Sequence, residues 1–171
     1  YAGLTTVIPF ATYDFDREET LPQAIRRLKK EVGRQSVIDF GFHFILANPP
    51  YILESLPEAF RMGVTSFKMF MTYKKAVARM CSDGFIAMAM EIVAAHGGIV
   101  QLHCENGEVI DYLEDKAIAE GRTHPTDFPA TCPPWAEQEA INRAIHLGAM
   151  TNCPTYVVHL STQGGLERIK Q

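Results

Sequence analysis

Segments with the character of β-strands alternate with helical segments along the whole chain of 171 residues. This order is typical of repeated βα units, in which the strands lie parallel, and it predicts an α/β fold. The predicted strands are 5–10, 37–46, 65–71, 98–103 and 155–160. The predicted helices run from a cap at Thr20 to Val32, over 53–62, from Ser82 or Asp83 to Gly97, over 107–120, and from Pro134 to near Gly148.

Polar side chains gather on one face of each later strand. Lys68, Gln101 and His103 alternate with apolar neighbours such as Met69 and Leu102. Parallel strands that are covered on both faces usually read as continuous apolar runs, whereas the interior of a closed barrel accepts polar groups. The pattern therefore favours a (β/α)8 barrel with its polar strand faces inside. No glycine-rich loop follows the first strand, which argues against a dinucleotide-binding sheet.

The length of the chain limits how much of a barrel it can form. A complete (β/α)8 barrel needs eight strands and roughly 250 residues. Residues 1–171 are therefore interpreted as the central portion of a TIM barrel, with about five βα units. The first strand and the last strands are expected to be missing from this partial catalytic domain.

Composition narrows the class of partner. The net charge is −4, with acidic and basic residues mixed along the chain. Because nucleic acids and anionic membrane surfaces attract basic patches, neither is expected as a partner, and a small molecule is favoured. The four cysteines form no close pair, which fits a reducing compartment, so a cytoplasmic location is expected. No apolar run is long enough to span a bilayer.

Lys68 is the most unusual residue, because it lies in an apolar strand with no carboxylate within five positions. Burial of an unpaired ammonium costs roughly several kcal/mol. Such a lysine therefore commonly loses its proton, pairs with an anion or is covalently modified. His103 and His159 fall near the ends of later predicted strands, where barrels keep their active sites. Two imidazoles can converge on one metal ion. A lysine that adds carbon dioxide becomes a carbamate, whose two oxygens can bridge two metal ions about 3.5 to 4 Å apart.

Other interpretations of these residues stay open. Lys68 can pair with a distant acid, reach the barrel mouth or form a Schiff base. Each histidine alone is more often a hydrogen-bonded core residue than a ligand. His43, which shares the inward face, is interpreted as such an interior residue.

Three sequence motifs add a family resemblance that runs in order along the chain. They are Gly63–Tyr73 (GVTSFKMFMTY), Leu102–Gly107 (LHCENG) and Tyr156–Thr162 (YVVHLST). Together they resemble the dihydropyrimidinase and D-hydantoinase branch of the amidohydrolase superfamily. The resemblance implies that Lys68 is carboxylated and bridges two Zn²⁺ ions, and that His103 and His159 bind one of them.

The resemblance also implies roles around the metals. Tyr73 matches a catalytic tyrosine that donates to the substrate carbonyl and helps to stabilise the oxyanion, and Phe70 borders the substrate. Glu105, Asn106 and Ser161 are candidates for orienting the ligands from a second shell, although helix and turn capping is an equal alternative.

The implied activity is metal-dependent hydrolysis of a hydantoin or dihydropyrimidine ring to an N-carbamoyl amino acid. Allantoinase and dihydroorotase are alternatives, and a non-catalytic scaffold like the collapsin response mediator proteins is an alternative of another class. The family's His-x-His pair and its aspartate base fall outside residues 1–171, so this segment alone is expected to be inactive. The family also implies a homotetramer or homodimer.

Overall fold

The computed structural model describes residues 3–14, 19–47, 50–77 and 79–171. The strands are β1 (Thr6–Val7), β2 (Phe10–Ala11), β3 (Asp39–Phe40), β4 (His43–Ile45), β5 (Ser66–Phe70), β6 (Ile99–His103) and β7 (Thr155–Val157). The helices are α1 (Leu21–Gly33), α2 (Leu56–Arg61), α3 (Lys74–Val77), α4 (Asp83–Ala95), α5 (Gly107–Ala119), α6 (Pro134–Thr151) and α7 (Gln163–Ile169). Two 3₁₀-helices, η1 (Pro50–Ser55) and η2 (Pro125–Ala130), complete the described elements.

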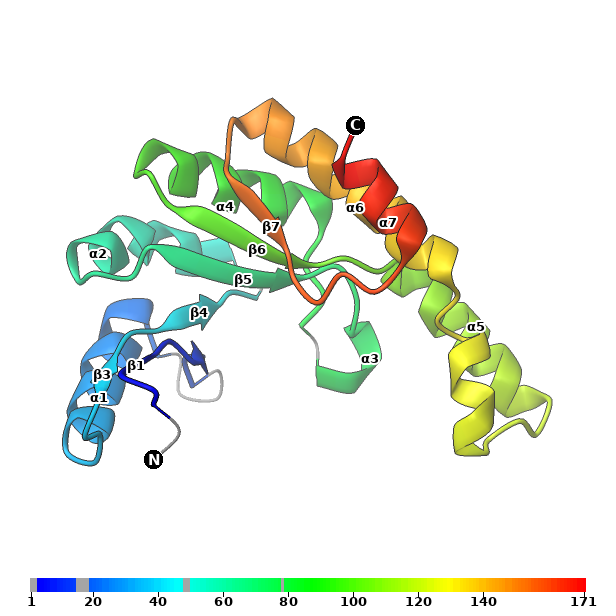
Figure 1. Cartoon of the computed structure of the whole chain (residues 1–171), viewed down its shortest axis with the longest axis horizontal. Coiled ribbons are helices and arrows are strands. Elements are labelled where there is room, and N and C mark those ends of the chain that lie inside the picture. Colours follow the sequence, from blue (N-terminus) through cyan, green and yellow to red (C-terminus); the bar gives the residue numbers. More distant parts are fainter. Residues whose placement is uncertain (1–2, 15–18, 48–49, 78) are drawn as a thin grey trace.

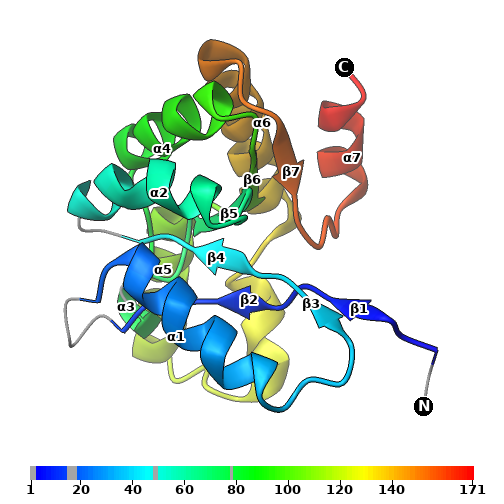
Figure 2. The same ribbon diagram turned by 90° about the vertical axis from the view of Figure 1, so that its left-hand side faces the viewer.

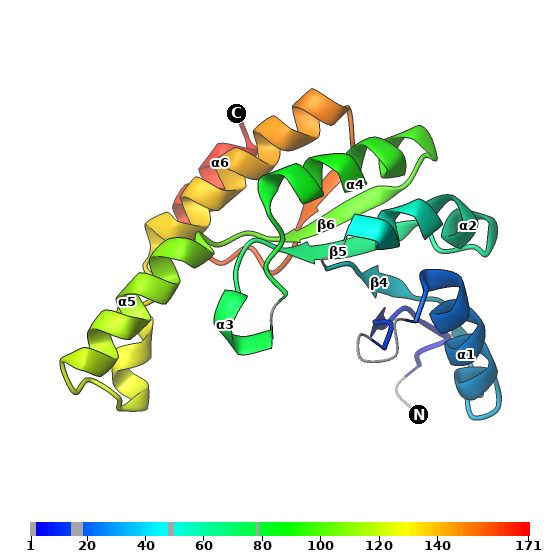
Figure 3. The ribbon, with the colours of Figure 1, turned by 180° about the vertical axis from the view of Figure 1, so that it is seen from behind.

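The main sheet has five parallel strands in the order β2-β4-β5-β6-β7, and β1 pairs with β3 in a short parallel ladder beside it. The α/β class with a parallel sheet is confirmed. The strands change direction progressively from β2 to β7, so that the sheet is curved (Figure 2). Helices α2, α4 and α6 lie along one side of β5, β6 and β7 (Figures 1 and 3). This arrangement fits the predicted portion of a barrel.

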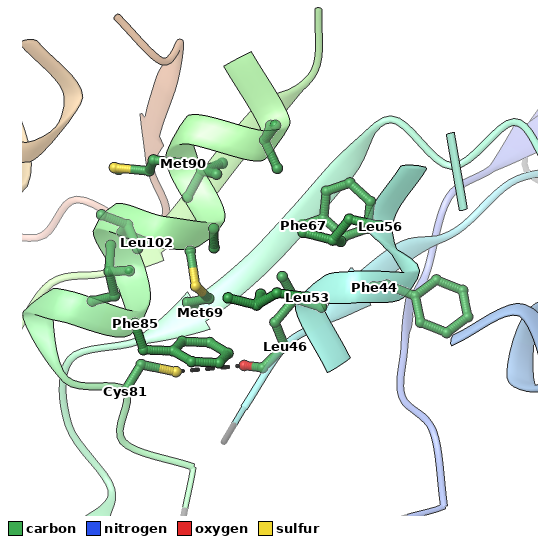
Figure 4. Packing of buried hydrophobic residues seen from close by; sticks show 14 of the residues in the cluster. Phe44, Leu46, Leu53, Leu56, Phe67, Met69, Cys81, Phe85, Met90 and Leu102 are labelled. Atoms are coloured by element: carbon green, nitrogen blue, oxygen red, sulfur yellow. Dashed lines mark hydrogen bonds between the residues drawn. The ribbon is translucent and has the colours of Figure 1, made fainter. Parts of the chain in front are cut away.

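The two faces of the sheet differ as the alternation predicts. Phe67 and Met69 of β5 and Leu102 of β6 are fully buried on the helix-covered side. Figure 4 shows them packed with residues of η1, α2 and α4, and Cys81 donates to the backbone oxygen of Leu46 at the edge of this cluster. The opposite face carries the polar side chains, namely Ser66, Lys68, Gln101 and His103. The site is therefore built on the face that the described helices leave uncovered.

The first two predicted strands are each interrupted. Segment 5–10 forms β1 and β2, with Pro9 between them, and segment 37–46 forms β3 and β4. Proline has no backbone N–H to give to a ladder, although its carbonyl still accepts from the amide of His43. The sheet therefore bends at this point instead of continuing as one long pair of strands.

Several helices also differ from their predicted bounds. The predicted helix 53–62 is divided between η1 and α2, with Pro57 in the first turn of α2. Helix α6 continues past Gly148 to Thr151, and Asn152 ends it in a left-handed conformation with φ 52°. Helices α3 and α7 were not predicted, because each is a short helix within a predicted connection or tail. Within the described part of the chain, none of the helices combines the length and apolar character needed to cross a membrane.

Tyr13 joins the end of β2 to the end of β4. Its hydroxyl donates to the backbone oxygen of Ala47 at 2.8 Å and accepts from the Ala47 amide at 3.2 Å. The side chain is 2% exposed, and this burial raises the pKa of Tyr13 to about 12, although the hydrogen bond from the Ala47 amide opposes the shift.

We expect the protein to lose stability between pH 10 and 12 through Tyr13. An acid whose pKa is raised on folding stabilises the folded state fully below its unfolded pKa of about 10, and this contribution is lost as the pH rises through the folded pKa. The loss attributable to Tyr13 is about 2 to 3 kcal/mol. Urea unfolding at pH 8, 10 and 12 measures it as the difference between wild type and Tyr13→Phe. Parallel stability curves for the two proteins would contradict the assignment.

Candidate active site

Lys68 occupies the middle of β5 on the uncovered face. The residue is 4% exposed, and its Nζ has no hydrogen-bond partner among the described residues. Nζ lies over the ring of Phe70, 4.6 Å from the ring centroid. Burial lowers the pKa of Lys68 to about 8, although the nearby Cys104 thiol opposes the shift. The fraction of neutral amine at neutral pH is therefore larger than for an exposed lysine.

His103 and His159 come together from β6 and the turn after β7. Nε2 of His159 lies 2.9 Å from Nδ1 of His103, and the two rings meet edge to face with centroids 4.3 Å apart. Nε2 of His103 lies 2.7 Å from a carboxylate oxygen of Glu105. When that nitrogen donates to Glu105, Nδ1 of His103 keeps its lone pair and faces His159. A carboxylate on the outer nitrogen is the usual support of a metal-binding histidine.

His159 is not on a strand, in contrast to the prediction for 155–160. Strand β7 ends at Val157, and His159 lies in a turn with φ 38°. Burial lowers the pKa of His159 first, and the positive charges of His103 and Lys68 lower it further. The neutral imidazole that a metal requires is thereby favoured.

Tyr73 lies beside the histidines on the loop after β5. Its ring centroid is 5.0 Å from that of His103 and 5.7 Å from that of Phe70, which is itself 5.7 Å from His103. Tyr73 has φ 70°, so two of the three described non-glycine residues with positive φ, Tyr73 and His159, are predicted site residues. Backbone strain of this kind concentrates at functional sites. Burial, followed by the charge of Glu105 and the Cys132 thiol, raises the pKa of Tyr73, which keeps the phenol protonated.

Gly107 lets the Tyr73 loop lie against the start of α5. A Cβ at Gly107 would stand 2.6 Å from the Cα of Thr72 and 2.8 Å from the backbone oxygen of Met71. The Gly107 amide also donates to that oxygen at 3.2 Å. Further along, the Lys74–Glu108 and Lys75–Asp115 ion pairs join α3 to α5. The start of α5 therefore fixes where the loop that carries Tyr73 can lie.

We expect Gly107→Ala to destabilise the protein by about 1 to 3 kcal/mol, because the new methyl group meets backbone atoms that cannot move aside. Gly84→Ala in α4 is the matched control, since open space surrounds Gly84. That variant should be neutral or more stable by about 0.5 to 1 kcal/mol. Urea unfolding compares the two, and equal stability of Gly107→Ala and wild type would refute the steric account.

The remaining predicted residues lie around this centre. Asn106 caps α5 by accepting from the Val109 amide, and its side-chain nitrogen donates to Glu139 of α6 at 2.7 Å. The Ser161 hydroxyl donates to the backbone oxygen of His159 at 2.7 Å. His43 lies next to Ser66 and Gln101 farther down the inner face, and its ring bonds to both, as an interior histidine was expected to do.

One buried residue near the site was missed by the sequence reasoning. Glu137 of α6 is 8% exposed and accepts from the Ser161 amide at 2.8 Å. It shares the buried face of α6 with Ala140, Ile141 and Ala144, at helical spacing. A carboxylate on the apolar face of a helix was the signal that could have revealed it.

Two adjoining cavities open beside the histidines. One of about 290 Å³ is lined by His103, Glu105, Cys132, Glu137, His159 and Ser161, among others. The second, of about 600 Å³, is lined by Thr72, Tyr73, Phe128 and other residues. Glu105 and Cys132 line both cavities. The cavity beside the Tyr73 phenol is therefore large enough to hold a small ring-shaped molecule.

Two imidazoles and one lysine amine are the nitrogen groups at the candidate metal site. No group of three or more His, Cys, Asp and Glu side chains among the described residues is arranged to hold an ion. The facing nitrogens of His103 and His159 and the unpartnered Lys68 nitrogen nevertheless fit a metal centre. Two nitrogens on one tetrahedral zinc ion, at about 2.0 to 2.1 Å from it, stand roughly 3.3 Å apart, so a small separation of the rings would admit the ion.

Comparison with known proteins finds relatives that match nearly the whole chain. The D-hydantoinase of Ralstonia pickettii is 35% identical over 168 residues, which cover 98% of this chain and 36% of that protein. Over nearly its whole length, the chain is therefore similar to the D-hydantoinases and dihydropyrimidinases. Dihydropyrimidinase 1 of Caenorhabditis elegans is 32% identical over 98% of the chain and 34% of its own length. No protein-family model matches the chain.

Solved structures of this family share the fold. The crystal structure of dihydropyrimidinase from Brevibacillus agri NCHU1002 superposes with a TM-score of 0.88 at 36% identity, over 98% of this chain and 36% of the other. The chain thus spans about a third of the length of the relatives that it matches.

Proposed function

We propose that this chain supplies part of the active site of a metal-dependent cyclic amidohydrolase, which opens a hydantoin or dihydropyrimidine ring to an N-carbamoyl amino acid. The observation that supports this most directly is the pair of facing imidazole nitrogens beside a buried, unpartnered lysine. The names of the relatives indicate the same reaction class. They favour these rings over allantoin and dihydroorotate.

Lys68 is proposed to act as a carbamate. The lone pair of its neutral Nζ adds to the carbon of carbon dioxide, an N–C bond forms as one C=O π bond opens onto oxygen, and one of the two amine protons passes to solvent. The product is an anion with two oxygens, which removes the cost of a buried, unpaired cation. Lowering of the lysine pKa by burial favours the neutral amine that this step requires.

Two Zn²⁺ ions are the proposed cofactors, with carboxylated Lys68 between them and the two histidines on one ion. When bound, such ions polarise a carbonyl and lower the pKa of water to about 7. His103 holds its Nδ1 toward the centre because Glu105 occupies its Nε2. The family's His-x-His pair and aspartate base are proposed to come from sequence outside residues 1–171, so this segment alone is expected to be inactive.

Tyr73 is proposed to donate its phenolic proton in a hydrogen bond to the ring carbonyl as that oxygen becomes negative. Its raised pKa keeps the phenol protonated, and the ring lies against that of His103. Phe70 is proposed to border the ring, since it contacts Tyr73 and lies beneath the Lys68 nitrogen.

The test measures zinc content and hydrolysis of hydantoin and dihydrouracil by the full-length protein. We expect bound zinc and ring opening that stops when a chelator removes the metal. A protein that binds zinc and opens neither ring would favour allantoinase or dihydroorotase activity, which the same assay checks with those rings. Absence of both zinc and hydrolysis would contradict the proposal and favour the non-catalytic scaffold.

A further inference from the structure

Glu137 is a buried acidic residue that lines the site and takes no part in the proposed reaction. It lies in the first turn of α6 and is 8% exposed. Burial of a carboxylate is costly unless it is paired or hydrogen-bonded. Among the described residues, no lysine, arginine or histidine forms a salt bridge with it, and its Oε2 is buried without a partner. The side chain therefore needs another reason for its position.

The single recorded bond of Glu137 reaches the turn that carries His159. Its Oε1 accepts from the backbone amide of Ser161 at 2.8 Å, across 24 positions of sequence. The Ser161 hydroxyl in turn donates to the backbone oxygen of His159 at 2.7 Å. A bond from an amide to a carboxylate is stronger than one to a neutral acceptor. Two hydrogen bonds thus link helix α6 to the backbone of His159.

The turn requires such support because its conformation is unfavourable. His159 has φ 38°, in the left-handed region, which is unfavourable for a residue other than glycine. Backbone pairing with β6 ends before His159, because its last hydrogen bond runs from the Val158 amide to the backbone oxygen of Leu102. The position of the imidazole, 2.9 Å from His103, therefore depends on contacts outside the sheet.

We propose that Glu137 is a positioning residue that holds the His159 turn in its metal-binding conformation. The metal part of this inference rests on the proposed function. Glu137 also lines the 290 Å³ cavity together with both histidines. Its carboxylate and that of Glu105 therefore lie where their negative charge would balance the positive charge of a bound divalent metal ion. The carboxylate acts through Ser161 and not by direct contact with the metal or the substrate.

The first test uses metal-free, full-length protein and compares Glu137→Ala with wild type. Hydrogen exchange of the Ser161 amide should accelerate at least roughly tenfold, because its acceptor is gone. Exchange of the Val158 amide, which bonds to Leu102, should not change. Unchanged protection of the Ser161 amide would overturn the proposed contact.

The second test measures the zinc dissociation constant by competition with a chelator. Glu137→Ala should weaken zinc binding roughly 10- to 100-fold, as loss of an outer partner of a ligand does. Glu137→Gln keeps a side-chain oxygen that can accept from the Ser161 amide, so its zinc affinity should lie between those of Glu137→Ala and wild type. This variant keeps the test decisive if Glu137→Ala fails to fold. Glu91→Gln, at an exposed position on α4, is the control.

The visible absorption of the Co²⁺-substituted protein should shift in Glu137→Ala, because the ligand angle of His159 changes. Lower thermal stability with unchanged zinc affinity and an unchanged cobalt spectrum would overturn the positioning role and leave the proposed function intact. Absence of zinc binding in wild type would instead refute the proposed function, and the exchange experiment would still decide whether Glu137 holds the turn.

Discussion

Lys68→Met should abolish metal binding and catalysis in the full-length protein while making the metal-free protein more stable. Methionine fills nearly the same volume on the inner face of β5 but cannot form a carbamate. Hydrolysis should fall at least about 10³-fold, because the proposed zinc ions, which would activate water, would lose a shared ligand. The metal-free protein should gain about 1 to 3 kcal/mol, because a buried nitrogen without a partner is removed.

The two halves of this expectation are measured separately, by zinc content with turnover and by urea unfolding of chelator-treated protein. Lys30→Met is the control, because Lys30 is exposed on α1 and should change stability by less than about 0.5 kcal/mol. Full zinc occupancy and normal turnover in Lys68→Met would sink the carbamate proposal. Borohydride trapping of a carbonyl substrate on Lys68 would support a Schiff base instead.

Tyr73→Phe should lower turnover roughly 10²- to 10³-fold with no loss of zinc, as removal of one donor to a developing oxyanion does. The substitution keeps the ring that packs on Phe70 and His103 and removes only the hydroxyl. Because the bond strengthens in the transition state, kcat should fall far more than KM rises.

Steady-state kinetics on dihydrouracil or hydantoin, together with zinc analysis, check this expectation. Tyr112→Phe is the matched control, since Tyr112 is 62% exposed on α5. Turnover of Tyr73→Phe within twofold of wild type would exclude the phenol from the reaction. A parallel loss of zinc would show that Tyr73 supports the metal site and not the oxyanion.

The inner and outer faces of the sheet were predictable because strand alternation depends only on local sequence. Lys68 and His103 face one side of adjacent strands, and Phe67 and Leu102 face the other, as the period of two requires. The α/β fold class was predictable from the alternation of strand-like and helical segments along the chain. The bounds of β1 to β4 were less predictable, because Pro9 changes the ladder without removing the apolar pattern that suggested one long strand.

The sequence by itself determined the parallel α/β fold, the polar inner face and the motifs around Lys68, His103 and His159. Tertiary structure alone decided how these residues meet. The approach of Gly107 to Thr72 joins segments 35 positions apart, and the hydrogen bond from the Ser161 amide to Glu137 joins segments 24 positions apart. The left-handed conformation of His159 lies in the turn that this second bond reaches. Such contacts arise from the packing of α5 and α6 against the strand ends, and no local pattern encodes a distance between segments.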